Sequence, residues 1–128
     1  MLNRDLYKFS SVNGGSYKNI DNVIEETLPN GSKYMRFKPV DALSTPDYME
    51  RLCEEYRKEI GKEAIEPLVL IAAFILDFLC IHPFNDGNGR MSRLLTFLLL
   101  YQSGFEVGRF IICNFIEWNI YILYFCFY

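Results

Sequence analysis

Two apolar runs, residues 64–80 and 91–103, enclose a short polar segment, and this arrangement constrains the fold more than any other feature of the chain. His82 stands directly before Pro83, and a residue before proline is pushed out of the right-handed helical region. The first run should therefore end there as a helix, and a second helical pattern begins near Gly89. We predict a mainly α fold in which a loop is held between two buried helices.

The polar segment concentrates groups that bind phosphate. Gly87 and Gly89 allow the backbone to adopt positive φ, so that successive N–H groups can converge on an anion at the start of the second helix. Arg90 and Arg93 lie three residues apart in the first turns of that helix and can hold further phosphate oxygens. The segment therefore predicts a phosphate site.

Two further side chains of the segment suit chemistry on a nucleotide. Asp86 is a hard oxygen ligand beside the glycines and suits Mg²⁺. His82 is the only histidine of the chain, and its neutral imidazole can take a proton from an attacking hydroxyl. A histidine before proline and an Asp-Gly-Asn-Gly turn each have ordinary structural explanations when taken alone. Their order in one segment predicts transfer of part of a nucleotide to a hydroxyl.

The segment resembles the signature H-P-F-x-D-G-N-G-R-x-x-R of the Fic (filamentation induced by cAMP) family of nucleotidyltransferases. Every fixed position of that pattern is present, as His82, Pro83, Phe84, Asp86, Gly87, Asn88, Gly89, Arg90 and Arg93. The resemblance implies a Fic-type helical bundle and a protein adenylyltransferase, or AMPylator. Such an enzyme transfers AMP from ATP to a Ser, Thr or Tyr hydroxyl of a target protein and releases pyrophosphate.

The resemblance also implies a role for each side chain. His82 would be the general base, and Asp86 would hold Mg²⁺. Asn88 and the glycine backbone would bind the α-phosphate region, and Arg90 and Arg93 would bind the outer phosphates. The related Doc kinases depart from the motif in its glycine-rich part, so the Gly-Asn-Gly sequence favours AMP transfer from ATP.

A β-hairpin is predicted ahead of the helices, because residues 23–27 and 33–37 flank a turn-rich segment. A two-stranded ribbon is not stable alone in water, so we expect it to lie on the helices with one edge open to an extended peptide. Fic proteins have a similar flap beside the active site, which implies target docking here. The residues assigned to this flap are Tyr34, Met35, Arg36 and Phe37. The alternative is a hairpin that only covers part of the core.

Two further segments flank the hairpin. Residues 9–19 are turn-rich and resemble the Gly-x-Tyr-Arg segment that enters the Fic core, with Lys18 in place of the arginine. After the hairpin, a helix is predicted with Thr45 as N-cap and Pro46 in its first turn, ending at Gly61. Its apolar face is expected to comprise Tyr48, Leu52, Tyr56 and Ile60.

We expect residues 1–128 to form one domain, with the family resemblance strongest over 14–111 and an atypical apolar tail at 112–128. Glu117 interrupts that tail, which argues against a membrane span. The 16 acidic against 13 basic residues argue against nucleic acid as a partner. The start lacks a signal-peptide pattern and the four cysteines lack C-x-x-C spacing, so a cytoplasmic location is expected.

The partner implied by the resemblance is a target protein with a hydroxyl side chain. Many Fic proteins carry an inhibitory helix with the pattern Ser/Thr-x-x-x-Glu-Gly/Asn, which the sequence lacks, so a separate antitoxin or inhibitory chain is one alternative. Two hypotheses for function stand. The intact motif favours an active Mg²⁺-dependent AMPylator, whereas the short N-terminal part and the unusual tail favour a silent or truncated module that binds nucleotide or partner without turnover.

Overall fold

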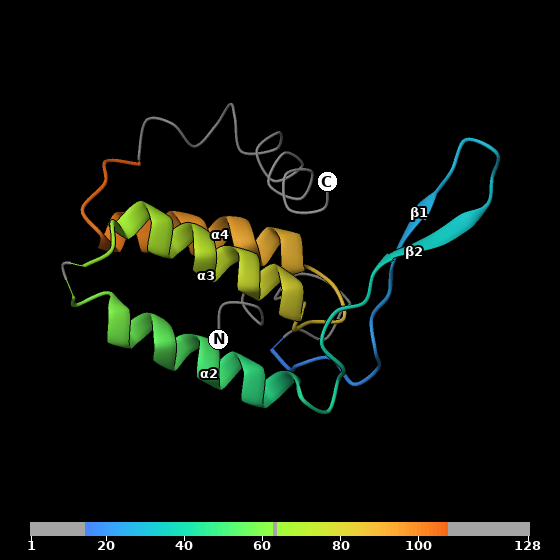
Figure 1. The fold of residues 1–128 in the computed structure, drawn as a ribbon, viewed down its shortest axis with the longest axis horizontal. Coiled ribbons are helices and arrows are strands. Elements are labelled where there is room, and N and C mark those ends of the chain that lie inside the picture. The colour runs from blue at the N-terminus through green and yellow to red at the C-terminus, as the bar shows by residue number, and fades with distance from the viewer. Residues whose placement is uncertain (1–14, 63, 108–128) are drawn as a thin grey trace.

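The computed structural model describes residues 15–62 and 64–107. Its elements follow in the order β1 (Ile24–Thr27), β2 (Lys33–Phe37), α2 (Thr45–Glu59), α3 (Pro67–Ile81) and α4 (Asn88–Gln102). The helix α3 packs against both α2 and α4, and the two strands project from one end of the helical layer (Figure 1). The predicted mainly α fold with one small hairpin is confirmed, while the predicted tail at 112–128 lies outside the described residues.

The core is centred on α3, as its apolar sequence predicts. The buried side chains of α3 are Ile71, Phe74, Ile75, Phe78, Leu79 and Ile81. From one side α2 adds Met49 and Leu52, and from the other side α4 adds Met91 and Leu99. Because all of these belong to one cluster, the loop between α3 and α4 is anchored at both ends in the core.

The first turn of α3 differs from the prediction. The helix begins at Pro67, later than the apolar run, because Glu66 adopts an extended ψ of 130° as a residue before proline must. Leu68 and Val69 are 52% and 61% exposed, so the helix is not buried on every side. Within the two described ranges, no helix is both long and apolar enough to cross a membrane.

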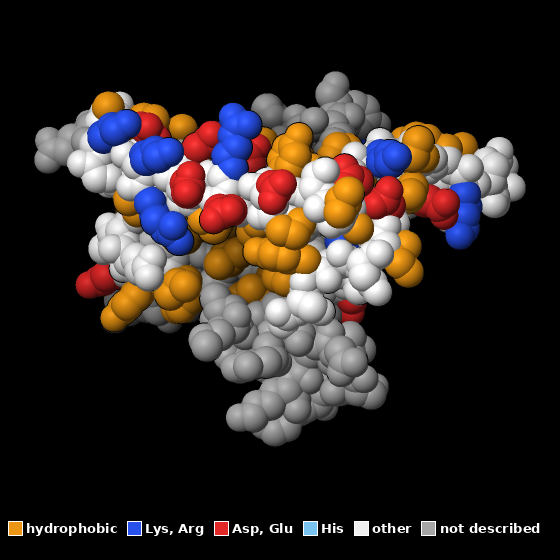
Figure 2. Space-filling model, turned by 90° about the horizontal axis from the view of Figure 1, so that it is seen from below, with side chains coloured by type: hydrophobic (Ala, Val, Ile, Leu, Met, Phe, Trp, Pro, Cys, Tyr) orange, Lys and Arg blue, Asp and Glu red, His pale blue; other side chains and the backbone are white. Residues whose placement is uncertain are grey.

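The start and the inward face of α2 also differ from the prediction. Ser44, not Thr45, is the N-cap, because the Thr45 hydroxyl is fully buried and donates to the Asp41 carbonyl at 2.7 Å. This anchor turns Met49 toward the core, whereas Tyr48 is 51% exposed. The charged residues of α2 cover its outer, solvated face, as predicted (Figure 2).

The hairpin forms where it was predicted but is placed differently. Its strands are antiparallel, with Glu26 opposite Tyr34, and the connecting turn uses Gly31 at φ 81°. An ion pair of 2.7 Å joins Glu26 to Arg36 across the strands. The expectation that the ribbon lies on the helices is wrong, since it extends away from them (Figure 1). Its stability comes from strand pairing, the turn and these cross-strand contacts.

Candidate active site

The loop after α3 starts with an unusual backbone turn at His82. This residue caps the helix with φ 53° and ψ 60°, and it is the one non-glycine residue at positive φ in the described part of the chain. The sequence predicts that His82 leaves the right-handed region, and it does so into the left-handed region, which is costly for a residue with a Cβ. Such strain persists only where the surroundings impose it, and it is common at functional sites.

The His82 imidazole is held toward its neutral form. The side chain is half-buried, and its Nδ1 atom is buried without a hydrogen-bond partner. Burial lowers the pKa of His82 below the ordinary 6.5, and the positive charge of Lys18 lowers it further. The Leu79 carbonyl opposes the shift without completing a hydrogen bond to Nδ1. A neutral imidazole is the form that accepts a proton from a hydroxyl.

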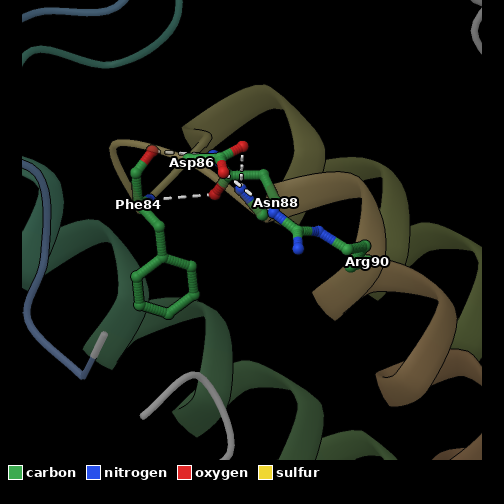
Figure 3. Close-up of polar contacts among 5 residues, drawn as sticks. Phe84, Asp86, Asn88 and Arg90 are labelled. Atoms are coloured by element: carbon green, nitrogen blue, oxygen red, sulfur yellow. Dashed lines mark hydrogen bonds and ion pairs between the residues drawn. The ribbon is translucent and has the colours of Figure 1, made fainter. Parts of the chain in front are cut away.

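Asn88 closes the loop onto itself (Figure 3). Its Oδ1 accepts a hydrogen bond of 2.9 Å from the Phe84 N–H, and its Nδ2 donates one of 2.7 Å to the Phe84 carbonyl. Asn88 is 2% exposed and Phe84 is half-buried, so these bonds are partly buried. In this conformation the side chain shapes the loop, and its predicted contact with the α-phosphate region stays a prediction.

Asp86 and Arg90 contact each other across the start of α4 (Figure 3). One Asp86 carboxylate oxygen accepts the Gly87 N–H at 2.6 Å, and the other accepts a hydrogen bond of 2.8 Å from the Arg90 guanidinium. The Asp86 side chain is 63% exposed. A single exposed carboxylate fits Mg²⁺ where phosphate oxygens and waters complete the coordination, so the residue present suits the predicted ion.

The two motif glycines have different roles. Gly87 is the N-cap of α4 and adopts φ 84°, as predicted. The same expectation is wrong for Gly89, which lies in the first turn of α4 and not among the described glycines at positive φ. A Cβ built on Gly89 would have no atom within 4 Å. The glycine therefore leaves open space at the helix start, where a side chain would meet an approaching ligand.

The N-terminus of α4 is the natural place for an anion in this loop. No side chain caps the helix, and the first N–H groups of a helix have no partner within it. Arg90 is exposed and Arg93 is half-buried, and both belong to the first two turns of α4. The structure thus brings together the predicted base, the carboxylate, the helix start and both arginines within one short loop and the helix that follows it.

The N-terminal segment that contains Lys18 and Asn22 forms hydrogen bonds with the loop. The sequence did not predict these bonds, although residues 9–19 resemble the segment that enters the Fic core. The Lys18 N–H donates to the Pro83 carbonyl at 2.8 Å, and the Lys18 ammonium donates to the Ile81 carbonyl at 2.9 Å. The Asn22 amide donates to the Phe84 carbonyl at 3.0 Å. Because the acceptors are backbone atoms, no pattern of residue types predicts these hydrogen bonds.

The Phe84 ring fixes the loop from two further directions. It stacks on Tyr17 with ring centroids 6.1 Å apart, and it contacts Phe78 of α3 at 6.3 Å in a tilted arrangement. Burial raises the pKa of the Tyr17 hydroxyl, and negative charge on α2, which includes Glu50, adds to that shift. The Tyr17 and Phe78 rings therefore hold Phe84 in place from the N-terminal segment and from α3.

The four residues assigned to the flap lie on β2. Tyr34 and Met35 are 46% and 58% exposed, and Arg36 and Phe37 are half-buried. The hairpin leaves the helical layer at the end where the loop after α3 lies, and it extends away from that layer (Figure 1). The exposure of β2 suits a docking edge, and a docking role stays a prediction.

The chain is similar in sequence and fold to known proteins. The model of the Fic/DOC family matches residues 1–100. The chain is 37% identical to protein adenylyltransferase fic-1 of Caenorhabditis elegans over 73 residues, which are 55% of this chain and 14% of that protein. It is also 37% identical to the phosphocholine transferase AnkX of Legionella pneumophila over 60 residues, which are 44% of this chain and 6% of that protein.

A solved structure shows the same fold. The crystal structure of a Fic domain containing signaling protein from Bacteroides thetaiotaomicron superposes with a TM-score of 0.68 at 31% sequence identity. The match covers 81% of this chain and 37% of that one. The chain spans less than half the length of the curated relatives that it matches.

Proposed function

The chain belongs to the Fic/DOC family, and from this premise we propose that it is a protein adenylyltransferase that transfers AMP from ATP to a Ser, Thr or Tyr hydroxyl of a target protein. The observation that carries the proposal is the half-buried His82, held in a left-handed turn one short loop before the start of α4, which no side chain caps. Burial lowers the pKa of His82, which favours the neutral form. A base and an anion-binding helix end are the two parts that this transfer needs.

The proposed reaction is a single displacement at the α-phosphorus of ATP. His82 takes the proton from the target hydroxyl, whose oxygen attacks the α-phosphorus. The bond from that phosphorus to the bridging oxygen breaks, and pyrophosphate leaves with the electron pair. The N–H groups at the start of α4 hold the phosphate oxygens, with Arg90 and Arg93 on the outer phosphates. Asp86 would hold Mg²⁺, which when bound offsets negative charge on the phosphates.

The target protein is proposed to dock on the hairpin. Each strand of a two-stranded sheet has one edge that its partner does not cover, and an extended peptide can pair with such an edge. The exposed Tyr34 and Met35 would then flank the docked peptide. A separate antitoxin or inhibitory chain is the second partner proposed for this protein.

The second candidate is a module that binds nucleotide or a partner without turnover. The observation in its favour is the 2.8 Å contact between Asp86 and Arg90, because the chemistry needs both groups and each engages the other. Nucleotide would have to separate them before either could act on a phosphate or a metal.

Labelled substrates distinguish these functions. We propose to incubate the protein with Mg²⁺, cell lysate and ATP radiolabelled at either the α- or the γ-phosphate, and in parallel with CDP-choline labelled in its choline. AMP transfer labels protein only from the α-labelled ATP. Label only from the γ-position would indicate a kinase, and label from CDP-choline a phosphocholine transferase. Bound ATP with no labelled protein would favour the silent module.

The metal role of Asp86 has its own test. Calorimetric titration with ATP should show tighter binding with Mg²⁺ than without it, and Asp86→Ala should remove most of that difference. Asn85→Ala is the matched control, because Asn85 is an exposed neighbour whose amide contacts Asn19. Equal metal dependence in the Asp86 variant and the wild type would contradict the assignment.

A further inference from the structure

Lys18 is joined to the backbone on both sides of His82. Its ammonium donates to the carbonyl of Ile81, and its own N–H donates to the carbonyl of Pro83, at 2.9 and 2.8 Å. The residue is 3% exposed although it carries a charge. A lysine is rarely buried so completely unless its ammonium has partners.

The surroundings of Lys18 explain how the buried ammonium is tolerated. Ile81 is the last residue of α3, so its carbonyl lies at the negative end of the helix, which favours a cation. The carboxylates of Asp21 and Asp41 raise the pKa of Lys18, while burial lowers it by more. The ammonium is therefore directed at the helix end by geometry and supported there by two acids.

We propose that Lys18 is a positioning residue for His82. Its two hydrogen bonds fix the carbonyls before and after His82, and so hold this residue in the left-handed turn that aims the imidazole. The left-handed region is costly for histidine, and two fixed neighbours are what imposes it. The expected effect of Lys18 on catalysis rests on the proposed function, whereas its effect on His82 does not.

The single histidine makes the test specific. Magnetic resonance of the imidazole reports on His82 alone, in the full chain and without any substrate. Lys18→Met keeps the length and apolar stem of the side chain but removes the ammonium, and Lys18→Arg keeps a cation. The matched control is Lys38→Met, which removes an exposed lysine.

We expect Lys18→Met to shift the imidazole resonances and to raise the pKa of His82, because the nearby positive charge is gone. The positive charge of Lys18 acts on His82. The negative charges of Asp21 and Asp41 act on Lys18. Lys18→Arg should restore the pKa of His82 toward that of the wild type, and Lys38→Met should leave it unchanged. Identical His82 titrations in the wild type and Lys18→Met would overturn the inference.

The wild-type protein decides the matter even if Lys18→Met does not fold. As pH rises, the His82 resonances should move first when the imidazole loses its proton. They should move again at the pH where the Lys18 ammonium, followed through an isotope label, loses its own proton. A His82 spectrum that stays constant through the titration of Lys18 would show that the two groups are not coupled, and the inference would fail.

Catalysis is measured separately. Misplacing a catalytic group by about 1 Å can cost roughly a hundredfold in rate, so we expect Lys18→Met to lower labelling by roughly tenfold to a hundredfold, with partial rescue in Lys18→Arg. If the imidazole responds to Lys18 but no variant and no wild type transfers AMP, the proposed function fails while the positioning role stands. If Lys18→Met changes neither the labelling nor the His82 titration of an active protein, the positioning role fails while the proposed function stands.

Discussion

The loop after α3 and the β-hairpin lie at the same end of the helical layer, but they are built in opposite ways (Figure 1). The loop is tied to a distant segment by Lys18 and Asn22, and to the start of α4 by Asn88, through hydrogen bonds of 2.7 to 3.0 Å to backbone atoms in and next to the loop. The hairpin is tied mainly to itself, through strand pairing and the cross-strand ion pair of Glu26 with Arg36.

The difference follows from what each region would have to do. Chemistry at a phosphorus atom needs its groups held to within a fraction of an ångström, so a loop that carries it must be fixed from several sides. Docking an extended peptide needs only an open strand edge, and main-chain pairing tolerates many target sequences. Substitutions in the two regions should therefore fail in different assays.

The largest effect is expected at His82. His82→Gly removes the imidazole while glycine adopts φ 53° without strain, so the loop should keep its shape. Loss of a general base costs about 10² to 10⁴ in rate, and no second histidine exists to replace it. Protein labelling should fall by that factor while the calorimetric affinity for ATP stays unchanged. Labelling at the wild-type rate would remove His82 from the mechanism.

Asn88 tests how firmly the loop is fixed. Asn88→Ala loses both bonds to the Phe84 backbone and leaves the Phe84 N–H without its partner, while the Phe84 carbonyl keeps the Asn22 amide, so the free energy of unfolding should fall by about 1–3 kcal/mol. The measurement is a urea titration with the midpoint and slope compared. Asn85→Ala serves as the control, since its 3.2 Å contact with Asn19 is exposed and should contribute less than about 0.5 kcal/mol. Equal losses in both variants would mean that the loop is not specially fixed.

The hairpin should respond to proline and hardly at all to side chains. Proline placed along 23–27 and 33–37 removes one main-chain donor at a time, and each lost bond to a target costs about 0.5–1.5 kcal/mol, or roughly two- to tenfold in target labelling. ATP affinity should not change in any folded variant. Tyr34→Ala is the comparison, because it removes an exposed ring and leaves the edge intact. If no folded variant loses labelling selectively, the hairpin is not a docking edge.

The smallest effect concerns acid stability. The pKa of His82 is lowered in the folded protein, so below its ordinary value of 6.5 the unfolded chain takes up a proton that the folded chain still refuses. The contribution of His82 to the free energy of unfolding should be constant above about pH 6.5, fall as the pH drops through the window below it, and level off beneath the folded pKa. His82→Gly should lack this fall, which urea titrations at several pH values can measure. A parallel fall in both proteins would assign it to other groups.

Sequence reasoning located the hairpin, the three helices and the motif loop, because turn residues, proline and apolar spacing act locally. It missed Ser44 as the cap of α2 and the inward turn of Met49, because both depend on where the Thr45 hydroxyl finds its acceptor. It also missed the hydrogen bond from the Lys18 ammonium to the Ile81 carbonyl. These two residues are 63 positions apart, and a backbone acceptor can belong to any residue type. Local rules predict elements, and long-range hydrogen bonds decide how the elements meet.

The contact between Asp86 and Arg90 bears on ion selectivity. The resting loop presents a carboxylate and a guanidinium that already neutralise each other, in an exposed pair of the kind that contributes only about 0.3–0.5 kcal/mol. A lone cation would have to displace the arginine, and a lone phosphate would have to displace the carboxylate. Under the proposed roles, a magnesium nucleotide supplies a cation for Asp86 and an anion for Arg90. It can therefore replace the ion pair between these two residues in a single binding event. The loop would then distinguish the complex from either of its ions before any base is involved.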